Sequence, residues 1–173
     1  MKKVMFYLFA AVALFLVIWA IVVALTPKIS YQTSVSIAKP VEEVYRFLSD
    51  YQTAPQWITG LKRVEAISGV PAQAGFRSKY TFDEREREVI FEEEVLAVEP
   101  GRSFKFVLNG PGVTMLNETT LEASGNATIL NMSNEVTPVS FMMRVMSPFF
   151  KGMMRSRQEA DLQRLKQLLE EKN

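Results

Sequence analysis

The chain opens with a long apolar run. From Val4 to Leu25 it contains no charged residue. As a helix, these 22 residues would span roughly 33 Å, enough to cross the hydrocarbon core of a bilayer. Pro27 follows the run and ends the helical pattern. The sequence therefore predicts a transmembrane anchor over residues 1–27 and a separate domain over residues 28–173.

A cleavable signal peptide is the alternative interpretation of the same run. The apolar core of a signal peptide is usually about 7–15 residues long, which is shorter than the run found here. Val22 and Ala24 could serve as the small residues of a cleavage site before Leu25. The length of the run favours an uncleaved anchor.

Flanking positive charge predicts the orientation of the anchor. Lys2, Lys3 and the amino terminus precede the run, whereas only Lys28 follows it closely. By the positive-inside rule, the N-terminus lies in the cytoplasm and residues 28–173 lie outside it. In a bacterium this arrangement is a single-pass protein of the inner membrane with its domain in the periplasm.

The remaining chain begins with a strand and two short helices. Residues 29–38 alternate between apolar and polar side chains, which is typical of a strand with one buried face. Pro40 suits the first position of a helix that ends near Ser49-Asp50. A second short helix or turn covers residues 51–57 and ends at Gly60. Six strand patterns with short turns follow, which predicts an antiparallel meander: Leu61–Ser68, Gly75–Asp83, Glu88–Val98, Arg102–Leu108, Val113–Glu122 and Ala127–Val136.

The pattern becomes helical after Thr137-Pro138 and stays so to the end of the chain. Ser147 and Pro148 suggest an interruption, with Ser147 as the N-cap and Pro148 as the first residue of a long final helix. A curved sheet with one apolar face needs a cover, and this helix can supply it. The predicted fold class is α+β.

Several segments resemble START-like proteins of the SRPBCC superfamily, which includes polyketide cyclase/dehydrase and lipid-transport proteins. The resemblance covers about residues 29–170 and consists of apolar positions and turns. Its segments are Ile37–Asp50, Trp57 before a strand, Glu94-Val95 running to Glu99-Pro100-Gly101-Arg102, and Leu162-Gln163-Arg164-Leu165-Lys166.

This resemblance implies a helix-grip fold, in which the sheet wraps around the long C-terminal helix and leaves a cavity between them. Members of the superfamily bind sterols, lipids, plant hormones, quinones or polyketides, and a minority catalyse reactions. Fold alone does not assign function. The alternative architecture is another antiparallel α+β fold with a helix across the sheet.

Composition excludes several kinds of chemistry. The chain has no His and no Cys, which excludes His-dependent triads, thiol nucleophiles, disulfides and Cys or His metal sites. The domain without residues 1–27 carries 18 basic and 19 acidic residues, so it lacks the basic excess of a nucleic-acid binder. No phosphate-binding glycine loop or nucleotide motif is present. We therefore expect no metal, no cofactor and no nucleic-acid partner.

Apolar side chains provide the first candidate ligand site. The segment 141–154 is rich in Met and Phe, which give an adaptable apolar surface suited to irregular ligands. Ordinary core packing is the commoner role of such a stripe, and contact of its basic residues with anionic lipid is a third interpretation. The apolar candidates for ligand contact are Phe91, Phe104, Phe106, Met146, Phe150 and Met154.

Polar side chains provide further candidates. Arg157 and Asp161 lie one helical turn apart and could orient a ligand head group, or Arg157 could reach the surface. Glu93 is a buried carboxylate if it shares the inward face of its strand with Phe91. Three adjacent acids favour the other register, in which Glu93 is solvated. Asn117 could likewise line the cavity or lie on the surface.

These observations predict a membrane-tethered domain that binds a hydrophobic small molecule or lipid. One alternative is an enzyme of the cyclase/dehydrase type that uses Glu93, Asp161 or Tyr80. Another is a protein-interaction module with a filled core. We also expect residues 139–154 to form a mobile gate between the ligand site and the bilayer, because prolines bracket this segment and its apolar residues can repack.

Overall fold

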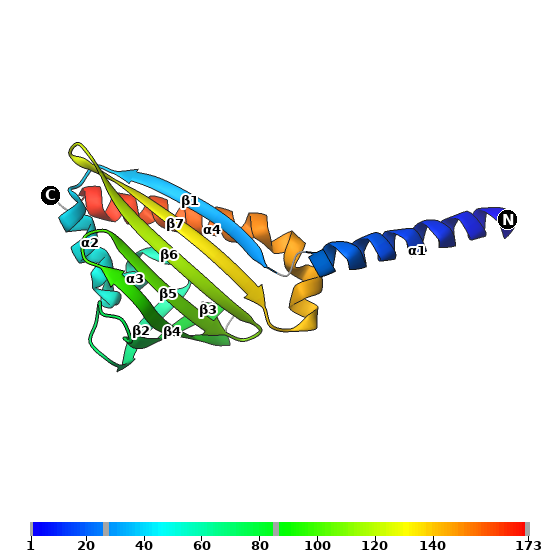
Figure 1. The fold of residues 1–173 in the computed structure, drawn as a ribbon, viewed down its shortest axis with the longest axis horizontal. Helices are drawn as coiled ribbons and strands as arrows, with labels where there is room; N and C mark the ends of the chain where they lie inside the picture. The colour runs from blue at the N-terminus through cyan, green and yellow to red at the C-terminus, as the bar shows by residue number, and fades with distance from the viewer. Residues whose placement is uncertain (1, 26–27, 85–86, 172–173) are drawn as a thin grey trace.

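The computed structural model describes residues 2–25, 28–84 and 87–171. It begins with the helix α1 (Lys2–Leu25), which extends away from the rest of the chain (Figure 1). The domain then starts with the strand β1 (Ile29–Ile37), as the alternating pattern predicts. α1 extends from the end of the domain at which β1 begins (Figure 1).

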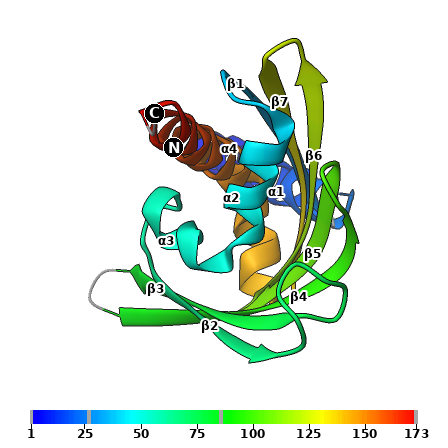
Figure 2. The same cartoon turned by 90° about the vertical axis from the view of Figure 1, so that its left-hand side faces the viewer.

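One antiparallel sheet forms the body of the domain. Its order is β1-β7-β6-β5-β4-β3-β2, so consecutive strands from β2 to β7 are neighbours and β1 closes the series beside β7. Figure 2 shows that the sheet curves strongly around one helix. The remaining strands are β2 (Leu61–Ser68), β3 (Arg77–Glu84), β4 (Arg87–Glu99), β5 (Ser103–Gly110), β6 (Val113–Ser124) and β7 (Ala127–Pro138).

Short helices close one end of the curved sheet. They are α2 (Val41–Ser49), the 3₁₀ turn η1 (Tyr51–Thr53) and α3 (Ala54–Trp57). β2 follows them and is bounded by Gly60 and Gly69, whose φ angles are +74° and +84°. Side chains disfavour these conformations, so the two glycines set the limits of the strand. A Cβ on Gly69 would also lie 2.9 Å from the carbonyl oxygen of Gly75.

The long helix α4 (Phe141–Glu171) lies in the concave face of the sheet (Figure 2). The predicted interruption at Ser147 and Pro148 is wrong, because the helix runs through both positions. Its start is instead capped by Ser140, whose Oγ accepts a hydrogen bond from the backbone N–H of Met143 at 3.3 Å. Figure 1 shows the first turns of α4 inclined to the rest. A proline within a helix bends it without ending it, since it removes one hydrogen bond.

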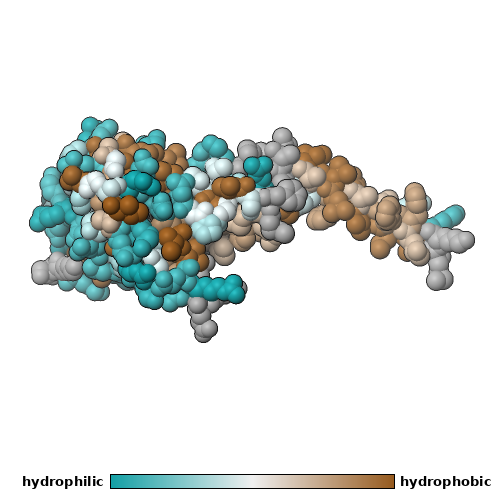
Figure 3. All heavy atoms as spheres, turned by 90° about the horizontal axis from the view of Figure 1, so that it is seen from below, coloured by the Kyte–Doolittle hydropathy of each residue, from teal (hydrophilic) through white to brown (hydrophobic). Residues whose placement is uncertain are grey.

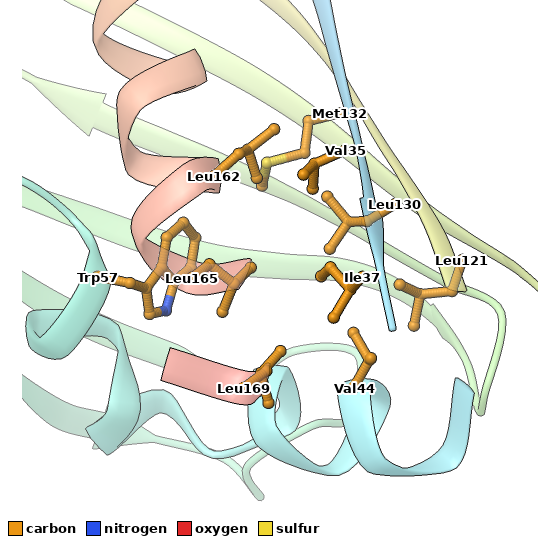
Figure 4. Close-up of a cluster of buried hydrophobic side chains, with 10 residues drawn as sticks. All are labelled: Val35, Ile37, Val44, Trp57, Leu121, Leu130, Met132, Leu162, Leu165 and Leu169. Atoms are coloured by element: carbon orange, nitrogen blue, oxygen red, sulfur yellow. The ribbon is translucent and has the colours of Figure 1, made fainter. Parts of the chain in front are cut away.

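The largest core cluster joins the C-terminal half of α4 to the sheet and to α2. Leu162, Leu165 and Leu169 project from α4 and are almost fully buried. Figure 4 shows them facing Ile37 of β1 and Leu130 of β7 among other buried side chains. Full burial of one such side chain contributes about 1.5–3 kcal/mol. The C-terminal end of α4 is therefore tightly packed. The cavity described below lies nearer the middle of the helix.

These features confirm the helix-grip architecture and the α+β fold class. The antiparallel meander, the two short helices after the first strand and the covering helix all occur in the predicted order.

Candidate functional site

A cavity of about 470 Å³ lies between the concave face of the sheet, α3 and α4. Its volume falls within the range of small-molecule sites, roughly 300–1,000 Å³. Most of its wall is apolar and aromatic. Phenylalanines from three neighbouring strands and methionines from the sheet and α4 contribute much of this wall: Phe82, Phe91, Phe104, Phe106, Met115, Met132, Met143 and Met154.

Glu93 is the acidic residue buried in the sheet wall, with only 6% of its surface exposed. It lies on β4 directly opposite Ser78 of β3, and the Ser78 hydroxyl donates a hydrogen bond of 3.2 Å to its Oε1. The hydroxyl of Tyr80 also donates to this carboxylate. Burial raises the pKa of Glu93, while the two hydroxyl donors oppose that rise by stabilising the charged form.

Two tyrosines in the cavity wall are shielded from water. Burial holds the pKa of Tyr80 well above its usual value, and the nearby Glu93 carboxylate raises it further. Burial alone raises the pKa of Tyr31 to about 12. Both phenols therefore remain protonated at neutral pH, and Tyr80 serves as a hydrogen-bond donor to Glu93.

A second polar cluster, the amide chain, crosses the opposite wall. Asn117 on β6 lies directly opposite Asn134 on β7, and its Nδ2 donates to Asn134 Oδ1 at 2.7 Å. Asn134 Nδ2 donates in turn to Gln158 Oε1 on α4 at 2.8 Å. The hydroxyls of Thr119 and Thr33 complete the chain by donating to Asn117 Oδ1 and Gln158 Oε1. The chain ties the sheet to the middle of α4.

A third polar group fastens the loop after α3 to α4. Asp161 is buried and accepts hydrogen bonds from the backbone N–H of Thr59 at 2.9 Å and from its hydroxyl at 2.5 Å. Arg157 donates to the carbonyl oxygen of Thr59 at 2.7 Å. A Cβ on Gly60 would approach this guanidinium to 3.1 Å. Asp161 and Arg157 thus bind the N–H and the carbonyl oxygen of the same residue, Thr59.

The cavity brings together eight of the ten side chains selected from the sequence. Six of them are Phe91, Glu93, Phe104, Phe106, Asn117 and Met154, and the other two are Arg157 and Asp161. Met146 and Phe150 lie outside its lining. Met146 is 40% exposed on α4, and Phe150 packs with Ile29, Val113 and Val136 at the α1 end of the domain.

The register of β4 differs from the one that three adjacent acids favour. Glu93 points inward with Phe91 and Val95, whereas Glu92 and Glu94 are exposed. Glu92 forms an ion pair with Arg77 on the outer face, with 3.1 Å between Arg77 Nη2 and Glu92 Oε2. The solvated interpretation of Glu93 is therefore wrong, because the apolar neighbours on its face determine which side of β4 is buried.

Sequence reasoning missed several polar residues of the site. Ser78, Asn134 and Thr59 each contact a predicted residue, and Gln158 contacts Asn134. Asn134 and Gln158 also line the cavity. One of these contacts has a signal in the sequence: counting outward from the Gly125-Asn126 turn places Asn134 opposite Asn117. The others depend on how α4 and the α3–β2 loop meet, which strand patterns do not reveal.

The first half of α4 carries exposed apolar side chains beside α1. Phe149 and Met153 are 64% and 60% exposed. The ring of Phe149 stacks on Trp19 of α1, with centroids 5.1 Å apart. α1 is long and apolar enough to cross a membrane, and Figure 3 shows it as a largely hydrophobic rod beside a domain of mixed character. The cavity residues Met143 and Met154 lie on the same helix.

Within the described ranges, no group of three or more acidic, His or Cys side chains is arranged to hold a metal ion. The polar groups of the cavity are suited to hydrogen bonding and to proton chemistry at the Glu93–Tyr80 pair.

Residues 28–170 match the protein family described as polyketide cyclase/dehydrase and lipid transport, which confirms the resemblance seen in the sequence. No curated protein matches the chain. Among solved structures, the aromatase/cyclase ZhuI from Streptomyces sp. R1128 superposes with a TM-score of 0.69 at 13% identity, covering 83% of this chain and 94% of the other.

Two structures of bacterial proteins are also similar. TTHA0849 from Thermus thermophilus gives a TM-score of 0.68 at 15% identity, covering 81% of this chain and 96% of its own. Protein CV1439 from Chromobacterium violaceum gives 0.65 at 16% identity, covering 82% and 97%. At these identities the three structures establish a shared fold.

Proposed function

Because the chain belongs to the polyketide cyclase/dehydrase and lipid transport family, we propose that its cavity binds a hydrophobic small molecule or lipid. The observation that carries this proposal is the largely apolar cavity of about 470 Å³ between sheet and α4. An apolar cavity of this size can bury most of the surface of a small hydrophobic molecule. The same observation argues against a protein-interaction module with a filled core.

We further propose that the domain, residues 28–173, is tethered to a membrane by residues 1–27. α1 supports a tether by its length and apolar composition, and its side chains are exposed over the Lys3–Ile21 span. The flanking lysines support a cytoplasmic N-terminus and a domain on the outer side of a bacterial inner membrane.

The segment 139–154 is proposed to control exchange between the cavity and the bilayer. Met143 and Met154 line the cavity, while Phe149 and Met153 are exposed and Phe149 stacks on Trp19 of α1. One segment therefore carries both cavity-lining and exposed apolar side chains. Lys151 lies on the same stretch and could contact anionic lipid. Transport, as distinct from binding, depends on this exchange.

Co-purification tests the binding proposal. The full chain would be extracted from membranes, and compounds bound to it would be identified by native mass spectrometry. Leu108→Trp should displace the compound, because Leu108 lines the cavity. Val107→Trp on the same strand is the matched control, because adjacent strand residues point to opposite faces. The proposal fails if the wild-type chain carries no apolar compound and takes up none from a lipid panel.

An enzyme of the cyclase type is the second candidate. The buried Glu93–Tyr80 pair favours it, because a carboxyl with a raised pKa beside a phenol can hold or move a proton. Turnover of a bound polyketide-like compound that disappears in Glu93→Gln, with the compound still bound, would favour catalysis over binding alone.

A further inference from the structure

We propose that Glu93 is the recognition point for the polar end of the ligand, and that this end is a protonated amine or another hydrogen-bond donor rather than an anion. The inference rests on the proposed function, since it assumes that the cavity is occupied. It adds the chemical class of the ligand, which neither the apolar wall nor the fold specifies.

The hydrogen-bond capacity of Glu93 exceeds what the protein supplies. A carboxylate can accept about four hydrogen bonds and, when ionised, donates none. The protein supplies donors from Ser78 and Tyr80. Because the carboxylate also lines the cavity, its remaining acceptor capacity is available to a ligand. A donor at that position would complete the coordination of a group that is otherwise costly to bury.

The basic residues of the strands beside β4 pair with acids on the outer face of the sheet. On β3, Arg77 and Lys79 lie on the outer face and pair with Glu92 and Glu65. On β5, Lys105 pairs with Glu118, which also faces outward.

From α4, Arg157 reaches the cavity, but its guanidinium donates to the Thr59 carbonyl. The groups that shift the pKa of Glu93 are Tyr80 and Ser78, with no cation among them. In the described part of the chain, Glu93 therefore lacks a positive partner, and a cationic ligand would supply one.

Aromatic side chains share the cavity wall with the Glu93 carboxylate. Phe91 shares the inward face of β4 with Glu93, and Tyr80 lies directly opposite Phe91 on β3. Phe91 is fixed in place, because its ring lies over Gly110, where an added Cβ would meet it at 2.2 Å, and it meets Phe82 edge-to-face at 5.5 Å. A cation within about 6 Å of an aromatic face is attracted to it, so these rings favour the same ligand class as the carboxylate.

Competition between matched ligands tests the inference. The chain has two tryptophans, so Trp19→Phe leaves Trp57 in the cavity wall as the only fluorescent tryptophan. This full-length variant, in phosphatidylcholine nanodiscs, is titrated with bromododecane, ω-bromododecylamine, ω-bromododecanol and ω-bromododecanoic acid. Bromine quenches Trp57 when the chain enters the cavity. Bromododecane reports cavity occupancy without a head group and so tests the proposed function separately.

We expect the amine to bind at least about tenfold more tightly than the carboxylate, as for a charge-assisted hydrogen bond, with the alcohol between them. Adding Glu93→Gln should remove this preference while leaving quenching by bromododecane intact. The matched control is Glu92→Gln, which alters the neighbouring acid on the outer face and should leave the order unchanged.

Equal binding of amine and carboxylate, or an order unaffected by Glu93→Gln, overturns the inference while bromododecane still binds. Failure of all four compounds to quench Trp57 overturns the proposed function and this inference with it. If Glu93→Gln abolishes quenching by bromododecane as well, Glu93→Leu, an apolar replacement of similar size, takes its place: loss of the amine preference in that variant supports the site, and retention of the full preference contradicts it.

Discussion

Trp19 of α1 stacks on Phe149 of α4, with ring centroids 5.1 Å apart and planes 27° from parallel. The contact joins the apolar helix to the helix that lines the cavity. Trp19 lies near the C-terminal end of the span Lys3–Ile21, where an interfacial depth suits its amphipathic ring. The stack therefore places a fixed point of α4 beside the end of the proposed membrane span.

The depth of Trp19 in a bilayer is the first prediction. In the full chain with Trp57→Phe, we expect Trp19 fluorescence to be quenched more strongly by a lipid nitroxide near the head group than by one near the acyl-chain end. Parallel measurements with Trp19→Phe give the contribution of Trp57, which should be quenched weakly by both. Absence of quenching of Trp19 by either lipid would contradict a membrane position for α1.

The hydrogen bonds between Asp161 and Thr59 provide the second prediction. Asp161→Ala removes the acceptor of two hydrogen bonds and leaves the Thr59 N–H without its partner. We expect the free energy of unfolding to fall by about 2–3 kcal/mol, measured by urea denaturation. Glu159→Ala is the control, since Glu159 forms an exposed ion pair with Arg155 on the same helix and should change stability little. Equal losses in the two variants would contradict the role of Asp161.

The two ends of α4 should respond differently to truncation, which is the third prediction. Leu165→Ala removes a fully buried side chain from the largest core cluster and should cost about 2–5 kcal/mol of unfolding free energy. Met154→Ala enlarges a cavity that already exists and should cost less than half as much, while weakening ligand binding. Thermal unfolding of both variants checks the difference. Similar costs would mean that the region around Met154 is packed as tightly as the core.

The fourth prediction concerns pH. Burial raises the folded-state pKa of Glu93 above its unfolded value of about 4.5. In the window between these two pKa values, the folded state binds more protons than the unfolded state, so the stability of the unliganded protein should fall as pH rises. Glu93→Gln should lack this component of the slope, as measured by urea denaturation across the acidic to neutral range. Glu92→Gln should keep it, and an identical slope in Glu93→Gln would contradict the burial argument.

The strands were predictable because their signals are local. β2 matches its prediction at both ends, since Gly60 and Gly69 bound it with backbone conformations that other residues disfavour. The covering helix was predictable from its periodicity, but its course through Pro148 was not. A proline is read as a stop in the sequence, whereas packing on both sides of it can maintain a bent helix.

The site was only partly predictable, because its polar contacts join distant segments. Glu93 was recognised as a candidate, but the run of three acids favoured the wrong face of β4. The pairing of Asp161 with Thr59 spans more than a hundred residues of sequence and depends on how the α3–β2 loop meets α4. Sequence periodicity identifies the buried face of an element, and it does not identify which element will lie opposite.

The amide chain from Thr119 to Gln158 has a kinetic consequence. Each amide in it has protein partners at both its oxygen and its nitrogen, with Gln158 Nε2 directed at the sulfur of Met132 at 3.5 Å. When a ligand leaves, no amide of this chain loses a hydrogen-bond partner. Release of the ligand therefore carries no desolvation cost at this wall. The residence time of a ligand would then be set by the burial of its apolar part and by the proposed contact at Glu93.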